Sequence, residues 1–485
     1  MDPILLIHGY SSEGKDNTVK QIYGSMPAEL RKLFGRGAVR EINLSRWISL
    51  SDGVNLDDVS FAMDRALKAE HADLLGGRFH VIIHSTGALV VRNWIRKFSP
   101  KPSPIANLVH LAGANFGSGL AHIGRGQLAR WGRLIFQGTG SGEHILNELE
   151  FGSWKTLDLH LHFLQAGNDM FKDYEVQEFC IIGSQTLGFL RPVPIRYVKE
   201  DSSDNTVRTS AGNLNFNYVE VTPKPKAFSM TVTALRRLTN KRLNNKHFTD
   251  TCYTYDLSQL ADRRREVPYA VAYETAHFGD DIGILSGSKN RPAVMPLVKA
   301  ALTAPYGDAA YKRIAERYRK ALDKTFERAA RLKSNLLEWN KQEQYEGHAQ
   351  IIFRLKDQDG KPVENFDVRF NSESARKGEE KLEKCIEDHH GNKVDKGALT
   401  FYLRTQKFES RRSKRPWRER LENVAPLTVE VTGDEPDSDD IAYIPVNIEL
   451  DNAEINALIQ SFRTTVIDVT LVRLPSTRVF AIEKG

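Results

Sequence analysis

Ser85 is the residue best placed to do chemistry, because the hydrophobic pattern changes abruptly around it. Residues 79–83 before it are rich in Val and Ile, as in a buried strand, and apolar residues follow it at helical spacing up to Phe98. A serine in a sharp turn between a strand and a helix can be held with its hydroxyl exposed above a sheet, and Gly87 would keep that turn uncrowded. We therefore predict a nucleophile at Ser85. A plain buried strand followed by a helix with a serine N-cap is the alternative.

A serine hydroxyl is a weak nucleophile unless a histidine removes its proton and a carboxylate orients that histidine. We predict that His277 is this base. Three other histidines suit the role less well: His8 belongs to a His-Gly turn, His84 is adjacent to the serine and should point away, and His110 lies within a predicted strand. The mechanism needs no cofactor, and no His-x-x-x-His or similar spacing indicates a metal site.

The carboxylate and the oxyanion-binding groups come from loops that follow predicted strands. Asp204 is the predicted acid, and Asp201 in the same loop is the closest alternative. Two backbone N–H groups should bind the oxyanion, that of Tyr10 after the first strand, with Ser11 as the alternative, and that of Thr86 directly after the nucleophile.

These loops must be positioned by a sheet, and strand patterns alternate with helix patterns along the first part of the chain. Helices are predicted at 19–34 and 56–70, and strands at 4–7, 38–42, 79–84, 105–111, 178–182, 218–221 and 267–273. Such alternation is typical of α/β folds with a mostly parallel sheet, which bind ligands beyond the carboxyl ends of their strands.

Five motifs together resemble the serine lipases and esterases of the α/β-hydrolase superfamily, most closely the lipase-like branch. They lie at 8–10 (His-Gly-Tyr), 84–87 (His-Ser-Thr-Gly), 115–118 (Asn-Phe-Gly-Ser), 204–207 (Asp-Asn-Thr-Val) and 277 (His). The resemblance covers roughly residues 1 to 300. It implies an α/β-hydrolase fold, a triad in the order Ser85, Asp204, His277, and hydrolysis of lipid esters through an acyl-enzyme.

The sequence departs from this pattern at Ile83 and Asn205, where the family usually has glycine. Asparagine tolerates a positive φ, so the second departure is mild, whereas Ile83 needs a small neighbour. Ile83 is also the main argument for an alternative function, a catalytically silent scaffold that serves as a binding module. An acyltransferase is a third interpretation.

Residues 119–164 interrupt the alternation with a basic, amphipathic and aromatic segment. Trp131, Leu134 and Ile135 are interleaved with arginines, a pattern that predicts a lid over an apolar cleft, able to open at a lipid surface. An ordinary surface helix packed on the sheet is the alternative.

The length of 485 residues predicts more than one domain. We expect a catalytic domain at 1–300, a long helical linker at 301–347 and a small β-sandwich-like domain at 348–485. The net charge of +6 is small for this length and argues against nucleic-acid binding. A lipid or a membrane surface is the expected partner, while the pattern does not specify an oligomeric state.

No apolar run reaches the roughly 20 residues of a membrane span, and none suits a secretory signal. We therefore expect a cytoplasmic protein in the producing cell. The layout is similar to that of bacterial type VI secretion lipase effectors. That resemblance implies export without a signal peptide, with the secretion machinery or an immunity protein as a partner.

Overall fold

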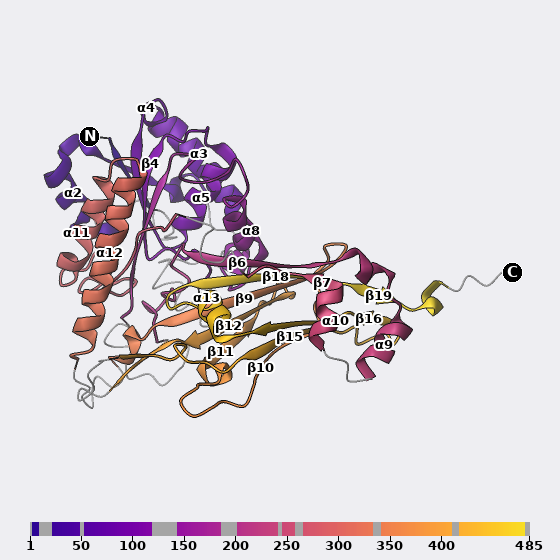
Figure 1. Ribbon diagram of the computed structural model, residues 1–485. Helices are drawn as coiled ribbons and strands as arrows, with labels where there is room; N and C mark the ends of the chain where they lie inside the picture. Colours follow the sequence, from indigo (N-terminus) through magenta and orange to yellow (C-terminus); the bar gives the residue numbers. More distant parts are fainter. Residues whose placement is uncertain are drawn as a thin grey trace. The chain divides into compact units, whose positions relative to one another are not determined.

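The computed structural model describes residues 2–8, 22–48, 53–118, 143–185, 201–240, 245–257, 265–332, 341–409 and 417–480. The chain forms two compact units (Figure 1). The first unit comprises Met1–Asn215, Arg265–Glu346 and Phe408–Trp417, and the second comprises Phe216–Arg264, Gly347–Lys407 and Arg418–Gly485. Among the described residues, no helix is long and apolar enough to cross a membrane.

A six-stranded sheet organises the first unit, and every strand pair in it is parallel. Its order is β2-β1-β3-β4-β5-β8, with bounds β1 Ile4–His8, β2 Val39–Asn43, β3 Phe79–His84, β4 Ile105–Leu111, β5 Gln177–Gly183 and β8 Tyr269–Ala272. Most of its apolar residues are buried, as expected for a parallel sheet covered on both faces. The predicted alternation of strands and helices is confirmed.

Helices flank this sheet (Figure 1): α2 Met26–Phe34, α3 Leu56–Glu70, α4 Ala72–Leu75, α5 Gly87–Phe98, α7 Glu143–Glu148, α8 Trp154–His162, α11 Arg291–Leu302 and α12 Asp308–Ala329. The α3 helix begins at a capping box, in which Asn55 and Asp58 each accept from the other's backbone N–H. Asn93 of α5 donates to Asp57 of α3 at 2.8 Å and to Ser60 at 3.0 Å. These bonds fix the helix that follows Ser85 against its neighbour.

The α12 helix is part of the first unit, although the amphipathic pattern at 301–347 predicts a linker. Its buried face packs on the edge of the sheet. Tyr311 donates to the Glu178 carbonyl of β5 at 2.7 Å, and Thr325 donates to the Val271 carbonyl of β8 at 2.7 Å. One apolar stripe on a helix indicates burial without indicating what covers it, so the pattern is the same for a linker and for a sheet-covering helix.

The second unit contains a six-stranded sheet of order β11-β12-β9-β18-β6-β7 and a three-stranded sheet of order β10-β15-β17. Its elements are β6 Phe216–Pro223, α9 Val232–Asn240, α10 Asn245–Cys252, β7 Tyr253–Thr254, β9 His348–Asp357, β10 Phe366–Ser372, β11 Ile386–Gly391, β12 Ala398–Arg404, β15 Leu427–Gly433, β16 Ile441–Tyr443, β17 Val446–Leu450, α13 Asn452–Leu458, β18 Thr464–Leu471 and β19 Arg473–Pro475; the short strands β13 and β14 span Gln406–Phe408 and Trp417–Glu419. Apolar residues of both larger sheets share one core, including Val221, Phe353 and Val429.

The strand predicted at 218–221 lies in this second unit, whereas the sequence pattern suggested the catalytic sheet. It forms β6, which pairs in parallel with β18 from Phe216 opposite Thr464 to Val221 opposite Val469. Alternating burial along β6 identifies a strand with one covered face, and it does not identify the sheet that the strand joins. The two units are therefore interleaved along the chain, with 216–264 in the second unit.

Candidate active site

Ser85 occupies a sharp turn between β3 and α5. Its φ is +53°, a left-handed conformation that costs a non-glycine residue about 1–3 kcal/mol. Three backbone hydrogen bonds hold it there: the Ser85 N–H donates to Leu111 at 3.2 Å, and the Ser85 carbonyl accepts from Ala88 at 3.1 Å and from Ala114 at 3.2 Å. The strained serine is thus fixed by its own helix and by β4 and the loop after it.

Ile83 lies beside Gly87, the residue four positions later. The Ile83 side chain is completely buried. A Cβ placed on Gly87 would lie 3.4 Å from the Ile83 Cβ, which is already van der Waals contact. A Cβ at 87 would therefore pack against Ile83 without displacing it, and Gly87 leaves that space open.

Asp204 and His277 are joined directly, although 73 residues separate them. The Asp204 Oδ2 atom lies 2.9 Å from His277 Nδ1, and the His277 backbone N–H donates to the Asp204 carbonyl at 3.0 Å. Both side chains are at most 1% exposed. Because the carboxylate accepts from Nδ1, the ring presents Nε2 as its other nitrogen, which is the orientation that a general base for a serine needs.

The loop around Asp204 is built to hold this carboxylate. Its second oxygen, Oδ1, accepts from the backbone N–H groups of Thr206 at 3.0 Å and Val207 at 2.8 Å. Asn205, directly after Asp204, has a φ of +83°, and Ser202 has a φ of +53°. The sequence departure at 205 therefore falls on a left-handed position, where asparagine is tolerated better than most residues.

His84, the residue before Ser85, faces His277, contrary to the expectation that it points away. Its Nε2 lies 3.2 Å from the His277 carbonyl oxygen, and the two ring centroids are 4.4 Å apart. Burial, and then the proximity of His277, keep the pKa of His84 well below its usual value, so the ring is neutral and donates through Nε2–H. Its position next to Ser85 in the sequence suggested that it points away, but β3 ends at His84, where the backbone turns.

Ser85 and His277 are not joined by a hydrogen bond in this structure. The His277 Nε2 atom is buried and has no hydrogen-bond partner among the described residues. Catalytic hydrogen bonds are often long without substrate and tighten when it binds. The structure therefore brings Asp204 and His277 together and leaves Nε2 free to take a proton.

Of the two predicted oxyanion donors, Thr86 lies among the described residues. Thr86 is 5% exposed and lies directly before α5, and within the described ranges its N–H makes no hydrogen bond. Tyr10 lies outside the described residues, as do the lid residues Trp131, Leu134 and Ile135. In the part of the chain that the structure describes, no cluster of His, Cys, Asp and Glu could hold a metal ion.

A buried charge cluster joins side chains of β4, β5 and α5 and was not predicted. The Arg92 guanidinium contacts both oxygens of the Glu178 carboxylate at 2.5 Å, and His110 Nε2 lies 3.1 Å from the same carboxylate. Burial alone would raise the pKa of Glu178, but Arg92 and His110 lower it to about 2. In the sequence, Arg92, His110 and Glu178 are far apart and resemble ordinary surface residues. The fold brings their side chains into contact.

Comparison with known proteins identifies the fold. No family model and no curated protein matches the chain. Among solved structures, phospholipase PlaB from Legionella pneumophila is 21% identical with a TM-score of 0.75, and the match covers 100% of this chain and 96% of that chain. The same phospholipase in complex with thio-NAD gives 20% identity, a TM-score of 0.75 and coverage of 100% and 97%. This similarity and the parallel sheet confirm the predicted α/β-hydrolase fold.

Proposed function

We propose that this protein is a serine carboxylester hydrolase that acts on lipid esters, with Ser85 as nucleophile, His277 as general base and Asp204 as the orienting acid. The observation that carries the proposal is the hydrogen bond of 2.9 Å between Asp204 Oδ2 and His277 Nδ1. It is supported by the left-handed φ of Ser85 at the end of β3, because such strain in a non-glycine residue is concentrated at functional sites.

The chemistry follows from these positions. The Ser85 Oγ attacks the ester carbonyl carbon while His277 Nε2 takes the hydroxyl proton, giving a tetrahedral oxyanion. The Thr86 N–H, with Tyr10 as the expected second donor, stabilises the negative charge. When the intermediate collapses, the leaving alcohol takes the proton from Nε2 and an acyl-Ser85 ester remains. Water then attacks this ester with His277 again as base, which releases the carboxylic acid and restores Ser85.

A lipid ester is the favoured substrate class for two reasons. A solved structure that covers 100% of this chain, PlaB from Legionella pneumophila, is described as a phospholipase. Independently, the sequence of residues 119–164 interleaves apolar and basic side chains, as a lid that opens at an anionic lipid surface would. On this proposal, hydrolysis rises when the ester passes from monomers to vesicles.

The decisive experiment compares purified Ser85→Ala with the unaltered protein on phospholipid vesicles and on a soluble short-chain ester. We expect the variant to lose both activities and to resist a fluorophosphonate label, because it lacks the hydroxyl that attacks the ester and the label. Ser229→Ala, at an exposed serine of the second unit, is the matched control and should react normally.

Retained turnover in Ser85→Ala would refute the assignment. An unaltered protein that takes no label would favour the silent scaffold, and transfer of the acyl group to an added alcohol in preference to water would favour an acyltransferase.

A further inference from the structure

Gln344 and Tyr345 contact the loops that carry Asp204 and His277, although they lie far beyond both residues in the sequence. They belong to the short 3₁₀ helix η6 Glu343–Tyr345 in the first unit. Gln344 is completely buried and Tyr345 is 1% exposed. Buried polar side chains must find their partners within the protein, so the hydrogen bonds of these two residues show what the segment holds.

The main chain of Gln344 holds the loop that leads to Asp204. Its carbonyl accepts from the Ser202 backbone N–H at 3.0 Å and from the hydroxyl of Ser184, directly after β5. Ser202 lies two residues before Asp204 and has a left-handed φ of +53°. The Gln344 carbonyl therefore joins the acid loop to the end of β5, at a residue whose strained backbone needs support from its surroundings.

The side chain of Tyr345 holds the loop that leads to His277 in a similar way. Its hydroxyl accepts from the Glu274 backbone N–H at 3.0 Å, and its ring stacks on Tyr273 with centroids 5.6 Å apart. Glu274 lies three residues before His277 and has a φ of +49°. A second left-handed residue beside the candidate triad is thus held by the residue next to Gln344.

Gln185 connects these contacts into a ring of hydrogen bonds. Its side-chain NH₂ donates to Gln344 Oε1 at 2.7 Å, and its own Oε1 accepts from the Tyr345 hydroxyl at 3.1 Å. The Gln185 backbone N–H also donates to the Thr275 carbonyl at 3.1 Å, in the loop of His277. Each of the three side chains bonds to both or one of the others, so movement of one strains the rest.

We propose that Gln344 and Tyr345 are positioning residues, which hold the Asp204 loop and the His277 loop together at the end of β5. This inference rests on the proposed function and deepens it, because the bond of 2.9 Å between Asp204 Oδ2 and His277 Nδ1 requires the two loops to keep their places. Both positioning residues act through the backbone of these loops. A misplacement of about 1 Å in such a site can cost about 10²-fold in rate.

Tyr345→Phe is the test variant, because it removes the hydroxyl with its two hydrogen bonds and leaves the ring on Tyr273. We expect kcat for a soluble short-chain ester to fall about tenfold and KM to change by less than about twofold, since the change acts on the loops of the acid and the base. Hydrogen exchange of the full chain, measured by mass spectrometry, should be at least about fivefold faster in peptides covering 201–212 and 273–279.

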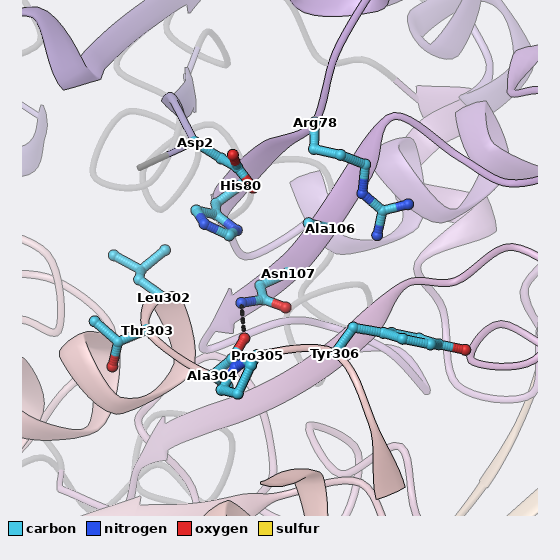
Figure 2. Close-up of a pocket in the computed structure, with 10 residues that line it drawn as sticks. All are labelled: Asp2, Arg78, His80, Ala106, Asn107, Leu302, Thr303, Ala304, Pro305 and Tyr306. Carbon is cyan, nitrogen blue, oxygen red and sulfur yellow. Dashed lines mark hydrogen bonds between the residues drawn. The ribbon is translucent and has the colours of Figure 1, made fainter.

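Two variants control for the loss of buried hydrogen bonds elsewhere in the first unit. Tyr318→Phe makes the same change at a completely buried tyrosine, whose hydroxyl donates to the Leu297 carbonyl at 2.9 Å. Asn107→Ala acts near the start of β4, at the opposite end of the sheet, where the Asn107 amide donates to the carbonyls of Ala301 at 2.9 Å and Ala304 at 3.0 Å; Figure 2 shows the second bond. Both controls should lower thermal stability and leave kcat and the exchange of the two loops within about twofold.

A double variant separates positioning from general damage. In the Asp204→Asn background, Tyr345→Phe should lower kcat by less than about twofold, because the carboxylate that it positions is already lost. The proposal is overturned if Tyr345→Phe has the same effect in both backgrounds, or if its two loops exchange no faster than those of Tyr318→Phe. An unaltered protein that neither hydrolyses esters nor takes a fluorophosphonate label refutes the proposed function instead, and the exchange measurement still decides whether Tyr345 holds the two loops.

Discussion

The two units differ in where they hold strained backbone. Within the described residues, seven non-glycine residues have a positive φ, and of these Phe462 alone lies in the second unit. The others are Ser85, Ala112, Glu175, Ser202, Asn205 and Glu274. All but Glu175 follow the carboxyl ends of sheet strands or lie in the loop that carries Asp204, so strain in the first unit gathers at the candidate site.

The second unit is organised around apolar packing instead. One core of buried residues runs through its two larger sheets. A strained backbone conformation persists only where surrounding contacts hold it in place. At Ser85, three backbone hydrogen bonds do so. The comparison indicates that the first unit concentrates its strained backbone around the candidate site, while the described part of the second unit is held mainly by apolar packing.

The largest expected effect is on turnover, at Asp204. Asp204→Asn should lower kcat for ester hydrolysis by roughly 10²- to 10⁴-fold, because the amide cannot hold His277 in the tautomer that leaves Nε2 as a base. Asp201→Asn, in the same loop, is the matched control and should change kcat by less than about threefold. Steady-state kinetics on a soluble ester measures both. The assignment of the acid fails if Asp201→Asn is the more damaging change.

Next in size is a loss of stability in the second unit. Phe353 is completely buried, with ring centroids 6.1 Å from Phe370 and 6.0 Å from Phe401. Phe353→Ala should lower the free energy of unfolding by about 3–5 kcal/mol, because it leaves a cavity in the shared core. Phe228→Ala, at a phenylalanine of the same unit that is 52% exposed, should cost less than about 0.5 kcal/mol. Equal midpoints for the two variants in urea would contradict a unit held mainly by apolar packing.

A third effect is the acid sensitivity of the buried cluster in the first unit. The pKa of Glu178 is lowered from 4.5 to about 2 in the folded protein, so its contribution is fully present above pH 4.5 and is lost as the pH falls towards 2. The advantage in unfolding free energy of the unaltered protein over Glu178→Gln should therefore shrink by about 3 kcal/mol across that window. Urea unfolding at pH 6, 4.5, 3 and 2 measures it. A constant difference would show that Glu178 does not carry the charge.

The smallest effect is expected at His84. His84→Ala removes the hydrogen bond to the His277 carbonyl and the ring contact at 4.4 Å, so kcat should fall about five- to tenfold, as for one neutral hydrogen bond. His84→Phe keeps a ring in contact and should recover part of the loss. A fall in thermal stability without a change in kcat would make His84 a packing residue only.

Local patterns predicted the sharp turn at Ser85 and the loop around Asp204, because each of these motifs carries its own turn chemistry. A strand, a serine, a glycine and a helix follow one another within 79–98, and the Asp204 loop has its left-handed position at Asn205. The sheet that β6 joins, the packing of α12 and the Arg92–Glu178–His110 cluster could not be predicted in this way. They depend on pairings between distant segments, for which burial patterns give the covered face but not its partner.

The pairing of β6 with β18 has a consequence for how the chain folds during synthesis. The two strands are roughly 250 residues apart, so β6 leaves the ribosome long before its neighbour in the sheet exists. At about 5–20 residues per second, this delay lasts on the order of 10–50 seconds. Among the described strands, only the two-residue β7 also pairs with β6. During that interval Val219 and Val221 have no sheet to cover them, and the nascent chain presents an unpaired strand edge that chaperones would bind.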